Sequence, residues 1–176
     1  MPPRAAARIV LALLAVLPAG LGAHEIPAEV TIHAFVRPEG DRLRLIVRAP
    51  MAAMRDINFP ARGPGYLDIG RVDPFLRSGA TLWIAGAVRL LENDTALPAP
   101  QIAAIRVSLP SDRSFVAYDS ALAHTTGTAL PADTEIVWNQ ALLDVVLDYP
   151  IRSDRSRFSI DPEFSRLGLR VTTVLR

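Results

Sequence analysis

Metal-binding side chains are few in this chain and gather near its amino end. Histidine occurs three times, at His24, His33 and His124, and cysteine is absent. If the chain is cut after Ala23, His24 becomes the first residue, and its α-amine and ring nitrogen can chelate a metal ion together. His33 could complete a nitrogen site that suits copper, nickel or zinc.

A pair of thioethers adds to this candidate metal site. Met51 and Met54 stand one turn apart if the segment is helical, and thioether sulfur suits Cu(I). Glu25 could supply an oxygen ligand. Each residue also has a simpler role, because terminal residues fray, strand histidines pack half-buried and methionine pairs fill cores. The predicted metal ligands are His24, His33, Met51 and Met54, with nickel or copper as the metal.

Signatures of enzyme catalysis are missing from the sequence. There is no Gly-x-Ser-x-Gly elbow, His-Glu-x-x-His motif or glycine-rich phosphate loop. The absence of cysteine and lysine removes thiol nucleophiles and Schiff-base chemistry. Asp144 and Asp148 could be paired carboxylates, but a solvated strand face is the simpler interpretation. An enzyme would need a pocket that gathers the aspartates with a histidine, so we predict a non-enzymatic protein.

One short motif, Ser-Asp-Arg-Ser, occurs twice, at residues 111–114 and 153–156. Serine and aspartate side chains bond back to their own backbone in turns, so both copies are predicted to be loops that lead into other elements. The alternative is an anion-binding or docking surface in which Arg113 and Arg155 act as forks.

The elements that must position these residues begin after a leader. Two arginines precede an apolar run from Ile9 to Leu17, and small residues follow up to Ala23, which is the order of a secretory signal peptide. We predict a signal peptide over residues 1–23, because the run is too short to span a membrane, and one exported domain over residues 24–176. The 19 basic and 18 acidic residues argue against a nucleic-acid partner.

Alternating apolar and polar residues predict a mainly β, β-sandwich-like domain with a few short helical inserts. Residues 29–36 and 43–47 are typical of a hairpin, with Arg42 and Arg44 on its solvent side. Further strands are expected over residues 88–91 and 96–97, which form a second hairpin, and over 102–109, 158–160 and 168–175. Residues 135–147 fit a strand better than a helix.

Helical inserts are expected at two places. The first covers residues 74–85, opened by Asp73 as the N-cap, with Phe75, Leu76, Leu82 and Trp83 on one face. The second is a single turn over residues 118–124, capped by Asp119.

Four stretches of the sequence carry a family resemblance: residues 23–27 (Ala-His-Glu-Ile-Pro), 31–36, 63–68 and 153–160. Together they resemble the extracytoplasmic N-terminal region of bacterial HupE/UreJ-type membrane proteins, over nearly the whole exported part. The resemblance implies a place on the periplasmic side of the bacterial inner membrane and a link to nickel supply for hydrogenase and urease. Metal-ligand histidines proposed for the family lie chiefly in its membrane part, so none is carried onto a residue here.

We therefore expect a non-enzymatic periplasmic domain of a HupE/UreJ-like protein that assists nickel-type metal uptake. The chain ends at Arg176 within an apolar strand, so we expect a truncated chain whose membrane link is a missing C-terminal helical region. One alternative is a free periplasmic copper or nickel module that uses His24. Another is a structural or protein-docking domain, for which both Ser-Asp-Arg-Ser loops must be exposed.

Overall fold

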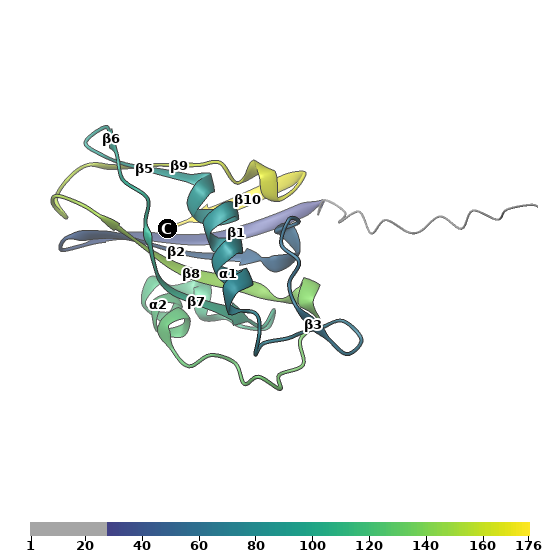
Figure 1. The fold of residues 1–176 in the computed structure, drawn as a ribbon. Coiled ribbons are helices and arrows are strands. Elements are labelled where there is room, and N and C mark those ends of the chain that lie inside the picture. The colour runs from purple at the N-terminus through teal and green to yellow at the C-terminus, as the bar shows by residue number, and fades with distance from the viewer. Residues whose placement is uncertain (1–27) are drawn as a thin grey trace, which may run out of the picture.

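The structure is a computed structural model that describes residues 28–176, so the predicted signal peptide and His24 lie outside the described residues. The domain is mainly β with two α-helices, which confirms the predicted fold class (Figure 1). Its elements are β1 (Glu29–Glu39), β2 (Arg42–Pro50), β3 (Ala61–Arg62), β4 (Tyr66–Leu67), α1 (Asp73–Gly79), β5 (Val88–Glu92), β6 (Thr95–Ala96), β7 (Gln101–Ser108), α2 (Tyr118–Thr126), β8 (Leu142–Pro150), β9 (Phe158–Pro162) and β10 (Arg170–Leu175).

The main sheet has five strands in the order β10-β1-β2-β8-β7. All neighbours are antiparallel except β1 and β10, which run parallel. The predicted hairpin of β1 and β2 is confirmed, and its two-residue turn uses Gly40 at φ +64°, a conformation that glycine adopts without strain. The predicted solvent position of Arg44 is wrong, because β2 lies inside the sheet and Arg44 Nε donates to Asp148 Oδ1 at 2.8 Å.

One face of this sheet holds the larger hydrophobic core. It is covered by α1 and by a smaller sheet of order β6-β5-β9, so the two sheets share one core (Figure 1). Leu76 and Trp83 are buried as predicted, but Leu82 is 54% exposed. The cause is a π-helical turn over Ala80–Ile84, whose wider period rotates Leu82 away from the core.

The opposite face of the sheet is covered by α2. Tyr118 and Ala121 of the helix pack on a row of apolar residues that crosses the sheet through Phe35, Ile46 and Val146. Asp119 is not the cap of α2, because Ala117 holds the cap position, and Asp73 is not the cap of α1, because Val72 holds it.

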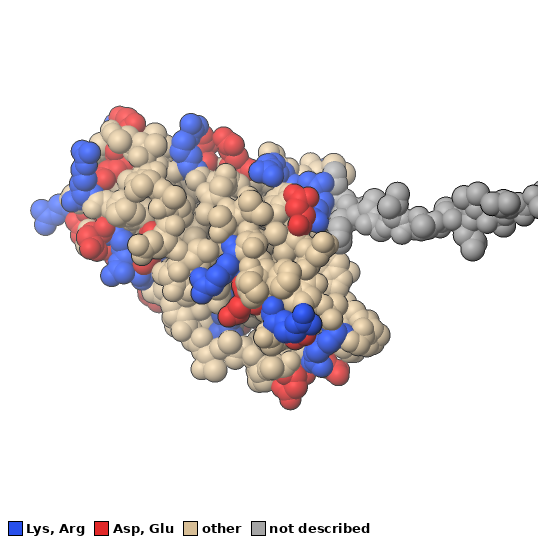
Figure 2. All heavy atoms as spheres, viewed as in Figure 1, with Lys and Arg blue, Asp and Glu red and all other residues tan. Residues whose placement is uncertain are grey.

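Most of the remaining sequence expectations hold. The second hairpin forms between β5 and β6, with Asn93 and Asp94 at positive φ in its turn. The ambiguous apolar stretch is a strand from Leu142 on. Within residues 28–176, no helix has the length and apolar character needed to cross a bilayer. Figure 2 shows side chains of both charges interspersed on one face, without dominance of either sign.

Candidate functional site

A row of ionisable residues crosses four strands beneath α2. In the strand register, His33 of β1 lies opposite Arg48 of β2, Arg48 lies opposite Asp144 of β8, and Asp144 lies opposite Arg106 of β7. Residues at this spacing share one face of the sheet, since side chains alternate along each strand. The row therefore places a carboxylate between two guanidinium groups.

Asp144 is the centre of the site. Its side chain is fully buried, and Arg48 binds it with two nitrogens: Nε donates to Oδ1 at 2.7 Å and Nη2 donates to Oδ2 at 2.6 Å. The Ser108 hydroxyl, also buried, donates to Oδ2 at 2.6 Å. Asp144 was expected on a solvated strand face, and this is wrong because α2 and the loop before it cover that face.

The first Ser-Asp-Arg-Ser loop is fastened to this centre. Asp112 Oδ1 accepts from Arg48 Nη2 at 2.7 Å and from the Ser114 backbone N–H at 2.9 Å. Burial alone would raise the pKa of Asp112, but the hydrogen bonds from Ser114 and Arg48 outweigh it and lower this pKa to about 2. Burial opposes the charge of Arg48, whose pKa is nevertheless raised because Asp144 and Asp112 bind it.

His124, in the last turn of α2, completes the polar cluster of Arg48, Ser108, Asp112, His124 and Asp144. Its Nε2 lies 2.8 Å from Ser108 Oγ, and its Nδ1 lies 3.3 Å from Asp112 Oδ2. Arg106 Nη1 donates to the His124 carbonyl oxygen at 2.5 Å. Burial, and then the charge of Arg106, lower the pKa of His124, so the ring is neutral at pH 7.

The chain of contacts from Asp112 through His124 to Ser108 resembles the triad of a serine hydrolase. Two features decide whether the serine could act as a nucleophile, the position of its hydrogen and its exposure. Ser108 has a single hydroxyl hydrogen, and two acceptors lie within reach of it, Asp144 Oδ2 at 2.6 Å and His124 Nε2 at 2.8 Å. A neutral ring with its hydrogen on Nδ1, toward Asp112, has Nε2 as an acceptor. The serine is also only 1% exposed. A substrate cannot reach the buried Ser108 oxygen in this arrangement, which holds a fixed network of hydrogen bonds between β7, β8 and α2.

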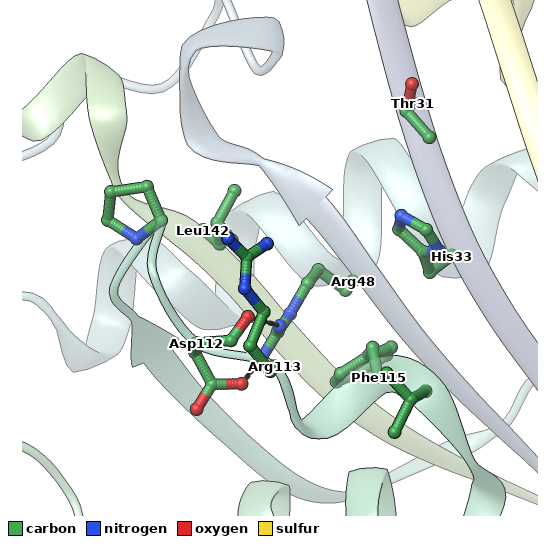
Figure 3. Close-up of a pocket in the computed structure, with 9 residues that line it drawn as sticks. Thr31, His33, Arg48, Asp112, Arg113, Phe115 and Leu142 are labelled. Atoms are coloured by element: carbon green, nitrogen blue, oxygen red, sulfur yellow. Dashed lines mark hydrogen bonds and ion pairs between the residues drawn. The ribbon is translucent and has the colours of Figure 1, made fainter.

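Beside the polar cluster lies a hollow of about 230 Å³, which we call the α2-side hollow (Figure 3). Its walls include His33 of β1, Arg48, and Arg113, Phe115 and Val116 of the loop before α2. The Arg48 guanidinium carbon stands 4.1 Å from the centre of the Phe115 ring. Arg113 is exposed, and no ion pair or hydrogen bond to residues 28–176 engages its guanidinium group.

The structure does not gather the predicted metal ligands that it describes. Met51 and Met54 are buried in the larger core, whereas His33 points to the opposite face of the sheet and lines the α2-side hollow. Burial, Arg176 and Arg48 lower the pKa of His33, and its Nδ1 is buried without a hydrogen-bond partner in the described part. Over residues 28–176, no group of three histidine, aspartate or glutamate side chains is arranged to hold a metal ion.

The second Ser-Asp-Arg-Ser loop lies at the other end of β8 and organises a different carboxylate. Glu92 accepts hydrogen bonds from the Arg152 and Ser153 backbone N–H groups and from Ser156 Oγ. Backbone hydrogen bonds, that of Arg152 first, lower the pKa of Glu92. The loop is exposed, but Arg155 and Arg113 stand at opposite ends of the strand and cannot form one surface.

Sequence reasoning missed the polar cluster. A signal was present, since Arg48 and Asp144 are charged residues in otherwise apolar strands, and such residues need a partner when buried. The pairing itself could not be read, because the strand order was unknown. No protein-family model matches this chain, and no curated protein matches it.

The buried ion pair predicts a strongly non-additive mutant cycle. We expect Asp144→Ala to lower the free energy of unfolding by about 3–5 kcal/mol, because Arg48 is left buried without its main partner. The double variant Arg48→Met with Asp144→Leu should lose less than Asp144→Ala alone and less than the sum of the single variants Arg48→Met and Asp144→Leu, since neither member of the pair is left buried without the other. Denaturant unfolding followed by tryptophan fluorescence measures both. The exposed Arg42→Met serves as the control, with an expected loss below about 1 kcal/mol, and additive losses would contradict the role of the pair.

Acid should remove the contribution that Asp112 makes to the free energy of unfolding. Its folded-state pKa of about 2 is lower than its ordinary value of 3.8, so the stabilisation is complete above about pH 5 and is lost as the pH falls toward 2. We expect wild type to exceed Asp112→Asn by roughly 2 kcal/mol at pH 7, and this gap to shrink between pH 4 and pH 2. Unfolding curves at several pH values test this, and a constant gap would show that the Asp112 charge is not involved.

Proposed function

We propose that this chain is a non-enzymatic extracytoplasmic domain that docks a protein partner at the α2-side hollow. The observation that carries the proposal is Arg113, an exposed cation without a partner among residues 28–176, on a loop that Asp112 and Arg48 fasten to the sheet. A docking domain was expected to expose its Ser-Asp-Arg-Ser loops, and the first of them borders this hollow.

The chemistry of the hollow favours an acidic partner with an apolar side chain next to its carboxylate. Arg113 offers a planar fork for a carboxylate, and Phe115 and the 71% exposed Val116 offer apolar contact. Arginine and aromatic residues commonly dominate the energy of protein interfaces. Since the Asp112 contacts hold the loop in place before binding, less conformational entropy is lost when the partner docks.

The resemblance to HupE/UreJ-type proteins supports a place for this domain on the periplasmic side of the bacterial inner membrane, with a role in nickel-type uptake through its partner. Direct metal binding is less well supported. The positive charges of Arg48 and Arg176 act on His33 and oppose a cation there. A metal module would have to rely on His24, which lies outside the described residues.

Docking is tested by site-specific photo-crosslinking in cells that carry the gene. We expect a benzoylphenylalanine at position 116 to give one adduct of defined mass, and one at position 82, exposed on the opposite face, to give none. Arg113→Ala should reduce the adduct about tenfold, as expected for an interface arginine worth about 1.4 kcal/mol.

The matched control is Arg155→Ala, in the same motif at the far end of β8, which should leave the adduct unchanged. Each of three results would refute docking at the hollow. They are equal amounts of adduct from positions 116 and 82, no adduct from position 116, and an amount of adduct that Arg113→Ala does not change.

Export is tested with a reporter. Alkaline phosphatase fused after Arg176 should be active when residues 1–23 are present, because its disulfides form only outside the cytoplasm. A fusion that begins at His24 behind a start methionine should be inactive. Equal activity of the two fusions would refute the signal peptide.

A further inference from the structure

The main sheet has two edge strands, and only one of them is protected against pairing with another chain. At the β7 edge, a bulge lies between Ile102 and Ala104, and Pro100 precedes the strand. Bulges and prolines of this kind keep an edge strand from taking up a further strand. β10, at the other edge, has β1 as its one neighbour among residues 28–176, and it includes no proline. None of its six residues is buried, so this edge is open to a partner.

The bonds between β10 and β1 show which backbone groups of β10 face outward. The Arg170 N–H donates to the Ala28 carbonyl oxygen at 3.1 Å, so the backbone groups of Arg170 face β1. Because successive residues direct these groups to alternate sides of a strand, those of Val171, Thr173 and Leu175 point away from β1. No hydrogen bond from the described part of the chain engages them. They form an unused row of donors and acceptors along the edge.

Two exposed leucines stand at the two ends of this row. Leu169, one residue before β10, is 76% exposed, and Leu175, the last residue of β10, is 41% exposed. Val171, Thr173 and Leu175 share one face of the strand, since side chains alternate. When a further strand covers a sheet edge, exposed apolar side chains along it become buried, which favours the pairing. The edge therefore offers backbone bonds and apolar contact to the same partner.

A second copy of β10 fits this edge in antiparallel orientation, because the strand can pair with itself about a two-fold axis. Outward-facing residues must lie opposite each other for their backbone groups to bond. One such register sets Thr173 opposite Thr173 of the second copy. It also sets Arg170 opposite Arg176, and like charges directly opposite each other are unfavourable. Between these two arginines β10 carries no charge that would oppose pairing.

A second register avoids this repulsion. It sets Thr172 opposite Thr172 of the second copy and Val171 opposite Thr173, whose backbone groups then bond directly. Leu169 comes opposite Leu175 at both ends of the paired strands, so the exposed leucines cover each other twice. Registers that are shifted further would pair only about half of each strand. The match of backbone bonds, charge and apolar side chains favours a second copy of this chain as the occupant of the edge.

We propose that this domain forms a symmetric dimer by antiparallel pairing of β10 with β10 of a second copy, centred on Thr172, so that the two main sheets join into one. Directly paired residues keep their side chains on one face, so the α2-side hollows of both copies lie on the same face of the joined sheet. One paired strand from each copy buries less surface than the roughly 1,200–2,000 Å² of a stable interface. We therefore expect a weak dimer, with a Kd on the order of 10 µM.

The first test is sedimentation velocity of the chain, purified from cells that express it in full, at about 1 to 200 µM. We expect a change from monomer to dimer as the concentration rises. Thr173→Pro should weaken the dimer at least about tenfold, because it removes an outward-facing N–H without the loss of a bond to β1. Leu175→Lys should also weaken it, whereas Leu82→Lys, at an exposed leucine away from the edge, is the matched control and should change nothing.

Single cysteines then test the register, since the chain has none of its own. Thr172→Cys should give a disulfide-linked dimer under mild oxidation. Opposed residues that share no backbone bond have Cα atoms about 4.5 Å apart, which is within the range of a disulfide. Thr173→Cys should react much less, because Val171 and not a second Thr173 lies opposite it. Thr95→Cys, exposed on β6, is the control and should stay monomeric on a non-reducing gel.

Three results would overturn the proposal. They are a monomer at every concentration, a dimer that both Thr173→Pro and Leu175→Lys leave unchanged, and equal crosslinking of Thr172→Cys and Thr95→Cys. If Thr173→Pro does not fold, the other variants still decide the outcome. None of the substituted residues lines the α2-side hollow, so a failure here would leave the docking proposal untouched.

Discussion

The buried ion pair of Arg48 and Asp144 is the interaction on which the α2 side of this domain depends. Both charges lie inside the main sheet, on neighbouring strands, with Asp144 fully buried. Such a charge pair is tolerated only when every remaining donor and acceptor is satisfied. Ser108 and Asp112 meet this need, and through them the pair connects β7 and the loop before α2 to the centre of the sheet.

The same requirement makes the cluster a fixed network with a buried serine. A hydrolytic triad needs a serine hydrogen directed to histidine and room for a substrate above the oxygen. Here Ser108 is only 1% exposed, and Arg48 binds both Asp144 and Asp112. Arg113, which has no ion-pair partner among residues 28–176, lies at the edge of the cluster and borders the hollow. The fixed centre thus positions an exposed cation.

Residue patterns predicted much of the local structure. The alternation of residues 29–36 and 43–47 gave the first hairpin, and the turn residues Asn93 and Asp94 gave the second. The predicted apolar face of the first helix is wrong at Leu82, because a regular period of 3.6 residues does not anticipate a π-helical turn. The metal ligands were chosen by residue type alone, and Met51 and Met54 instead fill the core on the face away from His33.

The sequence by itself determined the β-rich class, the two hairpins, and the exclusion of thiol and lysine chemistry, because these follow from residue types and from neighbours along the chain. Only the tertiary structure decided which charges meet. Arg48 and Asp144 are 96 positions apart and become neighbours through strand order and register. The full burial of Asp144 has the same origin, as has the Tyr149 hydroxyl, which is buried without a partner among residues 28–176. Burial is set by the elements that fold over a strand and not by the strand's own residues.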